Sequence, residues 1–245
     1  MTRVTFFAVA TLGLSLLGGA ATTAQGQFIF AGNDGDGTVG QYSASTGAKT
    51  NAPSISLGLS NQSAHFQQFV FVAVSGSDLY VTGVNLATGP SAGKIGKYNA
   101  ITGAPINASL VSGLEAPFGI AVSGSTLFVT DIGSSGSNGT VGEYDANTGA
   151  TINAALVSGL HSPIGVAVSG SDLFVVNNKG PLGGKHTGSI GKYNAITGAT
   201  INAALVPNLS YADCIAVSGS SLFVTPPPTS ATRRSLCTTP PPEPR

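Results

Sequence analysis

The sequence predicts an all-β protein built as a β-propeller, an arrangement of four-stranded antiparallel blades around a centre. Three observations predict this fold: a phrase that recurs at a near-constant interval, short apolar runs within each copy, and a composition rich in glycine. The chain has 245 residues, and 34 of them are Gly. So many glycines indicate many tight turns between short strands rather than packed helices.

The recurring phrase is most complete at residues 117–130, where it reads Pro-Phe-Gly-Ile-Ala-Val-Ser-Gly-Ser-Thr-Leu-Phe-Val-Thr. Its apolar core returns roughly every 48 residues, an interval typical of solenoids and propeller blades, which are built from one supersecondary unit per repeat. A second phrase, most complete at residues 139–150, follows each copy except the last. The core copies begin at Val72, Ile120, Val166 and Ile215, and the other copies of the second phrase at Gly37, Gly93 and Gly188.

The first half of each repeat predicts a hairpin of two buried strands. Residues 120–122 and 127–129 are short apolar runs on either side of Ser-Gly-Ser, which is a turn sequence. Because the second run has no polar face, we expect both of its faces to be covered.

The second half of each repeat predicts two outer strands. Residues 141–144 alternate in polarity, as a half-exposed strand does. Residues 145–149 form a turn, in which Asn tolerates and Gly supplies a positive φ angle, and residues 151–157 form a fourth strand. Four antiparallel strands per repeat describe a propeller blade, and the missing helical period excludes leucine-rich and helical repeats.

Incomplete copies stand at both ends of the repeat region. Residues 28–30, 39–42 and 54–57 align with strands two, three and four, and residues 214–217 and 222–224 align with strands one and two. This is one strand more than four blades need, so residues 28–30 and 222–224 would compete for one position in a four-bladed ring. We expect about four to five blades, either as a ring closed by residues 214–217 pairing with the N-terminal strands or as an open remnant of a larger wheel.

Outside the repeats, both ends of the chain are expected to pack on nothing. Residues 1–24 have a short basic start, an apolar run over 4–17 and small residues over 18–24, which is the layout of a secretory signal peptide. The propeller domain then covers residues 27–225, and the Pro-rich tail over 226–245 is expected to be disordered. We expect a secreted, periplasmic or cell-surface protein with no membrane span after signal removal.

Composition narrows the classes of ligand. Only 8% of the residues are charged and the formal net charge is zero, so the chain lacks the basic stripe that neutralises nucleic-acid phosphates. Cys214 stands where the repeat has Gly119 and Gly165, and we expect a buried thiol there. The sequence does not decide whether Cys214 and Cys237 form a disulfide.

Three segments carry a resemblance to a known family: Pro117-x-Gly119-Ile-Ala-Val, Leu-Phe-Val-Thr-Asp at 127–131, and Thr-Val-Gly-Glu-Tyr-Asp at 140–145. The chain resembles the NHL family of propeller repeats over roughly residues 28–225, and it is similar to bacterial surface repeats with a Tyr-Val-Thr-Asn signature. The resemblance implies the fold and admits binding modules, scaffolds and enzymes, because such propellers host all three. The basic residue usual after the family's Asp-Ser-Gly turn is absent, which argues against the RNA binding known in that family.

No cofactor is predicted. His65, His161 and His186 are the only histidines, and no two of them have a short metal-binding spacing. Asp-Gly-Asp-Gly at residues 34–37 lacks the further acidic ligands of a calcium loop and is read as a plain turn.

Glu115 and His161 occupy equivalent positions just before an inner strand, where both would line a central funnel. Gluconolactonase-like propellers place acidic and amide ligands around one calcium ion there. The equivalent residues of this chain, Gln67 and Ser210, are poor ligands, so we predict no metal site and no catalytic residues.

The strongest functional signal is a contrast between constant and variable connections. The Ser-Gly-Ser hairpins and the Thr-Gly-Ala turns hardly change from copy to copy, whereas the connections between strands two and three do. By propeller geometry the constant turns lie on one rim and the variable loops on the other, and a variable rim often marks the binding face. Loops that nothing constrains would vary in the same way. The variable connections are residues 31–36, 82–92, 130–138 and 176–187.

These observations predict an exported, non-enzymatic propeller that binds a protein or glycan through its variable rim and that self-associates if the ring is open. One alternative is a metal-dependent hydrolase or lactonase-like propeller, which needs an acidic cluster in the funnel. Another is a truncated product of a longer repeat gene without independent function, which the abrupt Pro-rich end would fit. The residues predicted for the binding face are Asn85, Glu115, Asp131, His161, Asn177, Asn178 and His186.

Overall fold

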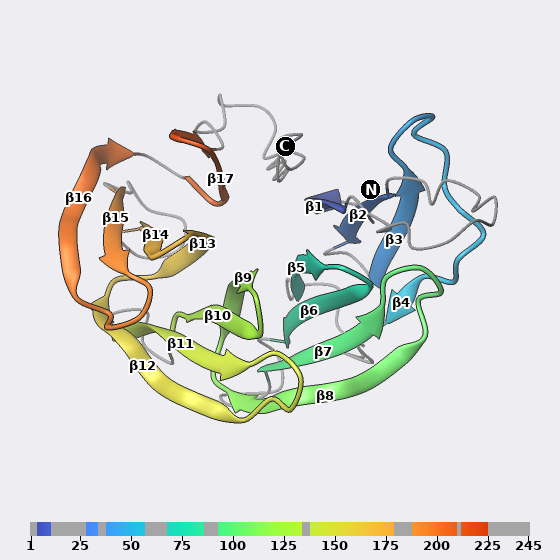
Figure 1. Ribbon diagram of the computed structural model, residues 1–245, viewed down its shortest axis with the longest axis horizontal. Coiled ribbons are helices and arrows are strands. Elements are labelled where there is room, and N and C mark those ends of the chain that lie inside the picture. The colour runs from blue at the N-terminus through green and yellow to red at the C-terminus, as the bar shows by residue number, and fades with distance from the viewer. Residues whose placement is uncertain are drawn as a thin grey trace, which may run out of the picture.

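The protein consists of strands and turns throughout the part of the chain that the structure describes. The computed structural model describes residues 4–10, 28–33, 38–56, 68–85, 93–133, 138–178, 188–209 and 212–224. These residues form four four-stranded antiparallel sheets and one two-stranded sheet, and none of their elements is a helix that could span a membrane. The sheets are the blades of a β-propeller and follow an arc in Figure 1. The predicted all-β propeller is confirmed.

Within each blade the strands run in chain order from the inside of the arc to its outside (Figure 1). The first blade contains β1 (Val4–Ala10), β2 (Phe28–Asn33), β3 (Thr38–Ser43) and β4 (Ile55–Ser56), and the second contains β5 (Gln68–Ser75), β6 (Asp78–Asn85), β7 (Gly93–Asn99) and β8 (Pro105–Leu114). The third contains β9 (Pro117–Ser123), β10 (Thr126–Asp131), β11 (Gly139–Asp145) and β12 (Thr151–Leu160), and the fourth contains β13 (Pro163–Ser169), β14 (Asp172–Asn177), β15 (Gly188–Asn194) and β16 (Thr200–Leu209). The terminal half-blade contains β17 (Ile215–Ser218) and β18 (Ser221–Val224).

The innermost strand of the first blade comes from the segment expected to be a signal peptide. β1 pairs antiparallel with β2, from Ala10 opposite Phe28 to Val4 opposite Asn33. The expectation that residues 1–24 pack on nothing is therefore wrong for residues 4–10 of the full chain, because an apolar run suited to export can also pair as a β-strand. The signal peptide itself stays a prediction, and the tail over 226–245 lies outside the described residues.

The incomplete copies at the two ends do not compete for one position. Residues 28–30 lie in β2 of the first blade, and residues 222–224 lie in β18 of the half-blade. In the described part of the chain β17 pairs with β18 alone, so the predicted ring closed by residues 214–217 is not formed. The strand count differs because β1 fills a position that the repeat alignment left empty. The strand predicted over 54–57 is also shorter and covers Ile55–Ser56.

The two kinds of constant turn lie against each other, as predicted. In the third blade, the backbone N–H of Ala146 in the β11–β12 turn donates to the carbonyl of Ser125 in the β9–β10 hairpin, at 2.8 Å. The side chain of Asp145 shapes the same turn, because its Oδ1 accepts hydrogen bonds from the N–H groups of Asn147 and Thr148. The second and fourth blades repeat the bond between turns with Ala100 to Ser77 and Ala195 to Ser171.

Neighbouring blades pack through the alternating side chains of their second strands. We call the surface toward the next blade the forward face and the surface toward the preceding blade the backward face. On β10, Phe128 clusters with Leu173 of the next blade, whereas Leu127 clusters with Tyr80 of the preceding one. Leu127 is 0% and Phe128 4% exposed, so both faces of this strand are covered, as predicted. By strand pairing, the equivalent forward residues are Phe30, Tyr80, Phe128, Phe174 and Phe223, and the backward residues are Ile29, Leu79, Leu127, Leu173 and Leu222.

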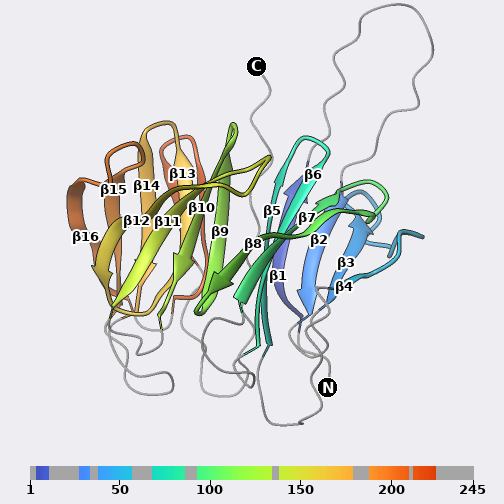
Figure 2. The same cartoon turned by 90° about the horizontal axis from the view of Figure 1, so that it is seen from below.

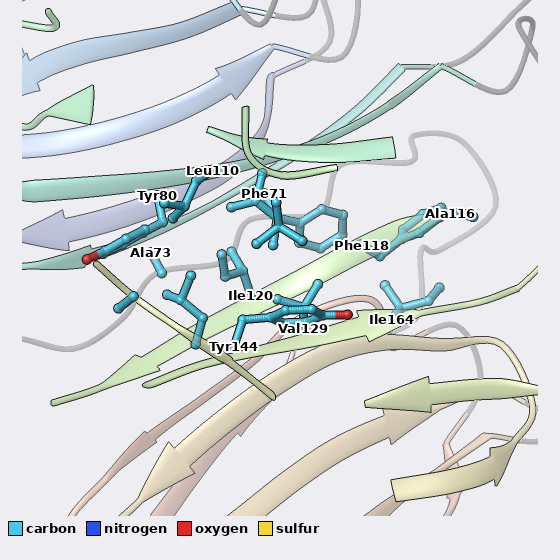
Figure 3. Packing of buried hydrophobic residues seen from close by; sticks show 14 of the residues in the cluster. Phe71, Ala73, Tyr80, Leu110, Ala116, Phe118, Ile120, Val129, Tyr144 and Ile164 are labelled. Carbon is cyan, nitrogen blue, oxygen red and sulfur yellow. The ribbon is translucent and has the colours of Figure 1, made fainter. Parts of the chain in front are cut away.

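Figure 3 shows the core between the second and third blades. Phe71 of β5 and Phe118 of β9 meet edge to face, with ring centroids 5.7 Å apart and an interplanar angle of 61°, which is a favourable aromatic geometry. The same cluster extends to Ile164 of the fourth blade and to Cys214 before the half-blade. Cys214 is 2% exposed and is therefore the buried thiol that we expected, while Cys237 lies outside the described residues.

The outer turns approach the preceding blade so closely that only glycine fits them. Gly149 in the third blade has a φ of 74°, and a Cβ added there would collide with the carbonyl of Leu110 in β8. Gly198 in the fourth blade meets the carbonyl of Leu156 in β12 in the same way. In the second blade an added Cβ at Gly103 would lie 3.1 Å from the carbonyl of Pro53, whereas Gly47 in the first blade has nothing within 4 Å. Contact with the preceding blade therefore accounts for the glycine in the second, third and fourth copies of the Thr-Gly-Ala turn. Seen from below, the blades stand side by side (Figure 2).

Replacing Gly149 with Ala tests this contact against a matched control. Gly124 in the β9–β10 hairpin also has a positive φ, 57°, but its added Cβ would have nothing within 4 Å. Both substitutions carry the backbone strain of about 1–2 kcal/mol for a left-handed residue, and only G149A adds overpacking, of about 1–3 kcal/mol. We expect urea unfolding to show a larger loss of stability for G149A than for G124A. Equal losses would mean that the blades do not touch at Leu110.

A second prediction concerns pH. The pKa of Asp145 lies below its ordinary value, first because Asp145 accepts hydrogen bonds from the backbone and hydroxyl of Thr148 and then from the N–H of Asn147. The ionised side chain therefore stabilises the fold above the ordinary Asp pKa, and this contribution is lost as the pH falls through the lowered value. The equivalent residues are Asn99 and Asn194. We expect thermal melts of D145N to lose less stability than the parent between about pH 6 and about pH 3. Identical pH profiles would contradict this.

Candidate functional site

Asp131 at the end of β10 holds the linker that enters the third blade. Its Oδ2 accepts a hydrogen bond from the N–H of Glu115 at 3.0 Å, and its Oδ1 accepts bonds from the N–H groups of Ala116 and Gly133, both at 2.9 Å. Glu115 and Ala116 lie between β8 and β9. The carboxylate thus ties the start of a variable loop to the connection between two blades.

The fourth blade repeats this corner with different chemistry. Asn177 at the end of β14 accepts a hydrogen bond from the N–H of His161 through its Oδ1, at 2.7 Å. Glu115 and His161 are therefore equivalent in the structure, as predicted, and both lie on the rim where the loops between strands two and three begin. The side chain of His161 is exposed and that of Glu115 is half-buried.

The carboxylates of Glu115 and Asp131 come to one corner of this rim. Asp131 Oδ1 bonds the N–H of Gly133, and Glu115 Oε2 would lie 3.5 Å from a Cβ added at Gly133. Throughout the described ranges, no group of three or more His, Cys, Asp or Glu side chains is close enough to hold a metal ion. This corner therefore contains two carboxylates, and that of Asp131 accepts hydrogen bonds from backbone N–H groups.

Asn178 extends the fourth blade toward the half-blade. Its Nδ2 donates to the carbonyl of Ala212 at 2.9 Å, and the residue is 4% exposed. Its Oδ1 is buried without a hydrogen-bond partner among the described residues. Asn178 thus links the fourth blade to the segment before β17. It was predicted for the binding face, but it is buried.

Several predicted residues are placed only in part or not at all. Asn85 ends β6, which puts its backbone beside the same rim, and nothing is described of its side chain. The remaining residues and segments that the sequence singled out, His65, Gln67, His186, Ser210 and residues 34–37, lie outside the described residues.

A buried lysine forms a polar cluster on the opposite rim that the motifs did not single out. Lys97 is 6% exposed, and its Nζ lies 2.8 Å from Asp78 Oδ2 and 5.5 Å from the centroid of the Tyr80 ring. Burial lowers the pKa of Lys97, but the hydrogen bond to Asp78 and the charges of Tyr80 and Asp78 outweigh it, so the pKa lies above its ordinary value. The amine donates to Asn147 Oδ1 of the next blade at 3.3 Å. This cation is therefore a link between blades rather than a base. The repeated pair Asp172 and Lys192, also 2.8 Å apart, was the sequence signal for it.

No protein-family model and no curated protein matches this chain. Solved structures of similar fold are β-propeller proteins. A chain of the nidogen/laminin complex matches with a TM-score of 0.57 and 14% identity over 91% of this chain and 72% of that chain. The calcium-binding protein regucalcin from Agrobacterium tumefaciens matches with a TM-score of 0.54 and 17% identity over 84% of this chain and 66% of that chain. The PQQ-bound aldose sugar dehydrogenase from Streptomyces coelicolor matches with a TM-score of 0.61 and 12% identity over 96% of this chain and 80% of that chain. At these identities the likeness shows the fold alone.

The anchoring role of Asp131 can be measured by unfolding. Asp131→Ala removes the acceptor of three backbone hydrogen bonds, each with a net value of about 0.5–1.5 kcal/mol, so we expect a loss of about 2–3 kcal/mol. The matched variant Asn177→Ala removes the acceptor of one such bond and should lose about 1 kcal/mol. Urea denaturation at neutral pH compares the two. A loss for Asp131→Ala no larger than that for Asn177→Ala would show that the corner is not held in this way.

Proposed function

We propose that the protein is an exported, non-enzymatic propeller that binds a protein or glycan ligand with the rim formed by the β8–β9 and β12–β13 linkers and the loops after β10 and β14. The observation that carries this proposal is the corner built by Asp131 and Asn177. In both blades a constant backbone geometry is kept while the side chain displayed beside it changes from Glu115 to His161. A fixed frame with exchangeable side chains suits recognition.

The use of the polar groups also supports binding rather than catalysis. The side-chain oxygens of Asp131 and Asn177 accept hydrogen bonds from backbone N–H groups. Both side chains therefore fix the backbone of the linkers. Asn178 is likewise turned into the junction between blades. The side chains of Glu115 and His161 flank these anchors, and in this proposal they contact the ligand together with the variable loops.

The second candidate is a metal-dependent hydrolase. The observation that favours it is the approach of Glu115 and Asp131 to the same corner around Gly133. Carboxylate oxygens are suitable ligands for Ca²⁺, which takes about six to eight oxygens. This candidate therefore requires further ligands from the loop after Gly133.

A double variant, Glu115→Ala with His161→Ala, separates the two candidates. The hydrogen bonds that Asp131 and Asn177 accept from these two residues come from backbone N–H groups, which alanine keeps. We therefore expect the corner to persist in the double variant, and its melting curve checks that it is folded. On a printed array of defined glycans and purified extracellular proteins, binding by the parent should be lost in the double variant and kept in Ile196→Ala, a control on the constant rim where Ile196 is 75% exposed.

Calcium provides the opposing outcome. A site filled at about one hundred times its dissociation constant adds about 2.7 kcal/mol of stability. A calcium-dependent rise in melting temperature that is present in the parent and absent from the double variant would favour the hydrolase and overturn the non-enzymatic proposal.

A further inference from the structure

The forward face of the half-blade has no partner in the described part of the chain. Phe223 on β18 is the repeat equivalent of Tyr80, Phe128 and Phe174, which are 2%, 4% and 8% exposed, yet Phe223 is 53% exposed. Its strand neighbours Leu222 and Val224 point backward and pack in the cluster of Phe174. The half-blade is therefore covered on one side and bare at the position where each earlier blade inserts an aromatic ring into its successor.

The backward face of the first blade is the complementary surface. Ile29 of β2 is partly exposed, whereas its equivalents Leu79, Leu127 and Leu173 are all 0% exposed. Tyr42 of β3 is also partly exposed, and its equivalents, buried to 3–5% exposure, are Tyr98, Tyr144 and Tyr193. The first blade therefore shows the apolar positions that would receive the aromatic ring of a preceding blade.

We propose that these two end faces bind each other between copies of this chain, so that the half-blade of one copy packs on the first blade of the next. The occupant of each face is a second copy because the two faces are the halves of a seam that this chain forms four times within itself, at Phe30, Tyr80, Phe128 and Phe174. Within one copy β17 and β18 form no strand pairing with the first blade. The half-blade, labelled by β17, and the first blade stand at the two ends of the arc (Figure 1). This inference does not depend on the proposed function.

The symmetry of the contact follows from its two different surfaces. A head-to-tail interface closes into a ring if its rotation returns to the start and otherwise continues into a filament. Large exposed apolar side chains such as Phe223 drive such association, because their burial removes apolar surface from water. An edge-to-edge dimer through β18 alone is the competing geometry, because β18 is an edge strand with unpaired backbone groups.

Sedimentation velocity of the full chain over a range of concentrations tests the proposal. We expect the parent to exceed the mass of one chain, 24.2 kDa, as concentration rises. Phe223→Asp on the forward end and Ile29→Asp on the backward end should each stay at one chain, with at least about a tenfold weaker self-association. Ile201→Asp is the control, because Ile201 is also 53% exposed but lies on the outer strand β16, and it should associate like the parent. Circular dichroism melts confirm that each variant is folded, and Tyr42→Asp replaces Ile29→Asp if the latter is not.

Mixing the two end variants gives the decisive result. A Phe223→Asp copy keeps a good backward face and an Ile29→Asp copy keeps a good forward face, so the mixture should form species of two chains and no larger ones. Failure of the folded variants to combine would overturn the proposal, as would a parent that remains at one chain at every concentration. Association of Ile29→Asp by itself would show the edge-to-edge dimer in place of the head-to-tail contact.

Discussion

Each blade of this protein depends on its neighbours to cover the two apolar faces of its second strand. Leu127 and Phe128 are adjacent in sequence, yet they are buried against different blades. A single blade would leave both of these faces in water, and the burial of such side chains is the main favourable term in folding. The face-to-face contact of blades therefore buries both faces of the second strand in the second, third and fourth blades.

This contact sets the local chemistry of the seams. Thr82 of β6 and Thr130 of β10 donate from their hydroxyls to carbonyls in the inner strand of the next blade, Phe118 and Ile164, each at 2.7 Å. A buried hydroxyl needs such a partner, and the carbonyl it meets lies at the point where the next blade is nearest. The outer turns follow the same logic, with Gly149 pressed on the backbone of the preceding blade. The strands that lead to the variable connections are thus held by contacts between blades, to which the buried threonine hydroxyls also contribute.

Repetition explains what could be predicted from the sequence and what could not. The three middle blades were predictable because each strand appears in several copies, and the apolar run at 127–129 has the covered faces that its lack of polarity implies. β1 was missed because it has no copy in the repeats, and its apolar residues fit an export signal equally well. At the candidate site, alignment correctly gave Glu115 and His161 equivalent positions in their blades. It gave no information on the direction of a side chain, so Asp131 was predicted for the binding face, whereas its carboxylate accepts hydrogen bonds from the backbone of a linker.

The pairing of β1 with β2 gives residues 4–10 two mutually exclusive fates. If the chain is exported, a translocation machine must receive this segment as an extended, unpaired tag, and a peptidase then removes it. If the chain folds first, the same residues become the innermost strand of the first blade, beyond the reach of either. The order of the two events would then decide the product. A chain that is cut loses β1, so β2 becomes the unpaired inner edge of the first blade. A chain that folds early keeps a complete first blade, and its export signal is no longer accessible.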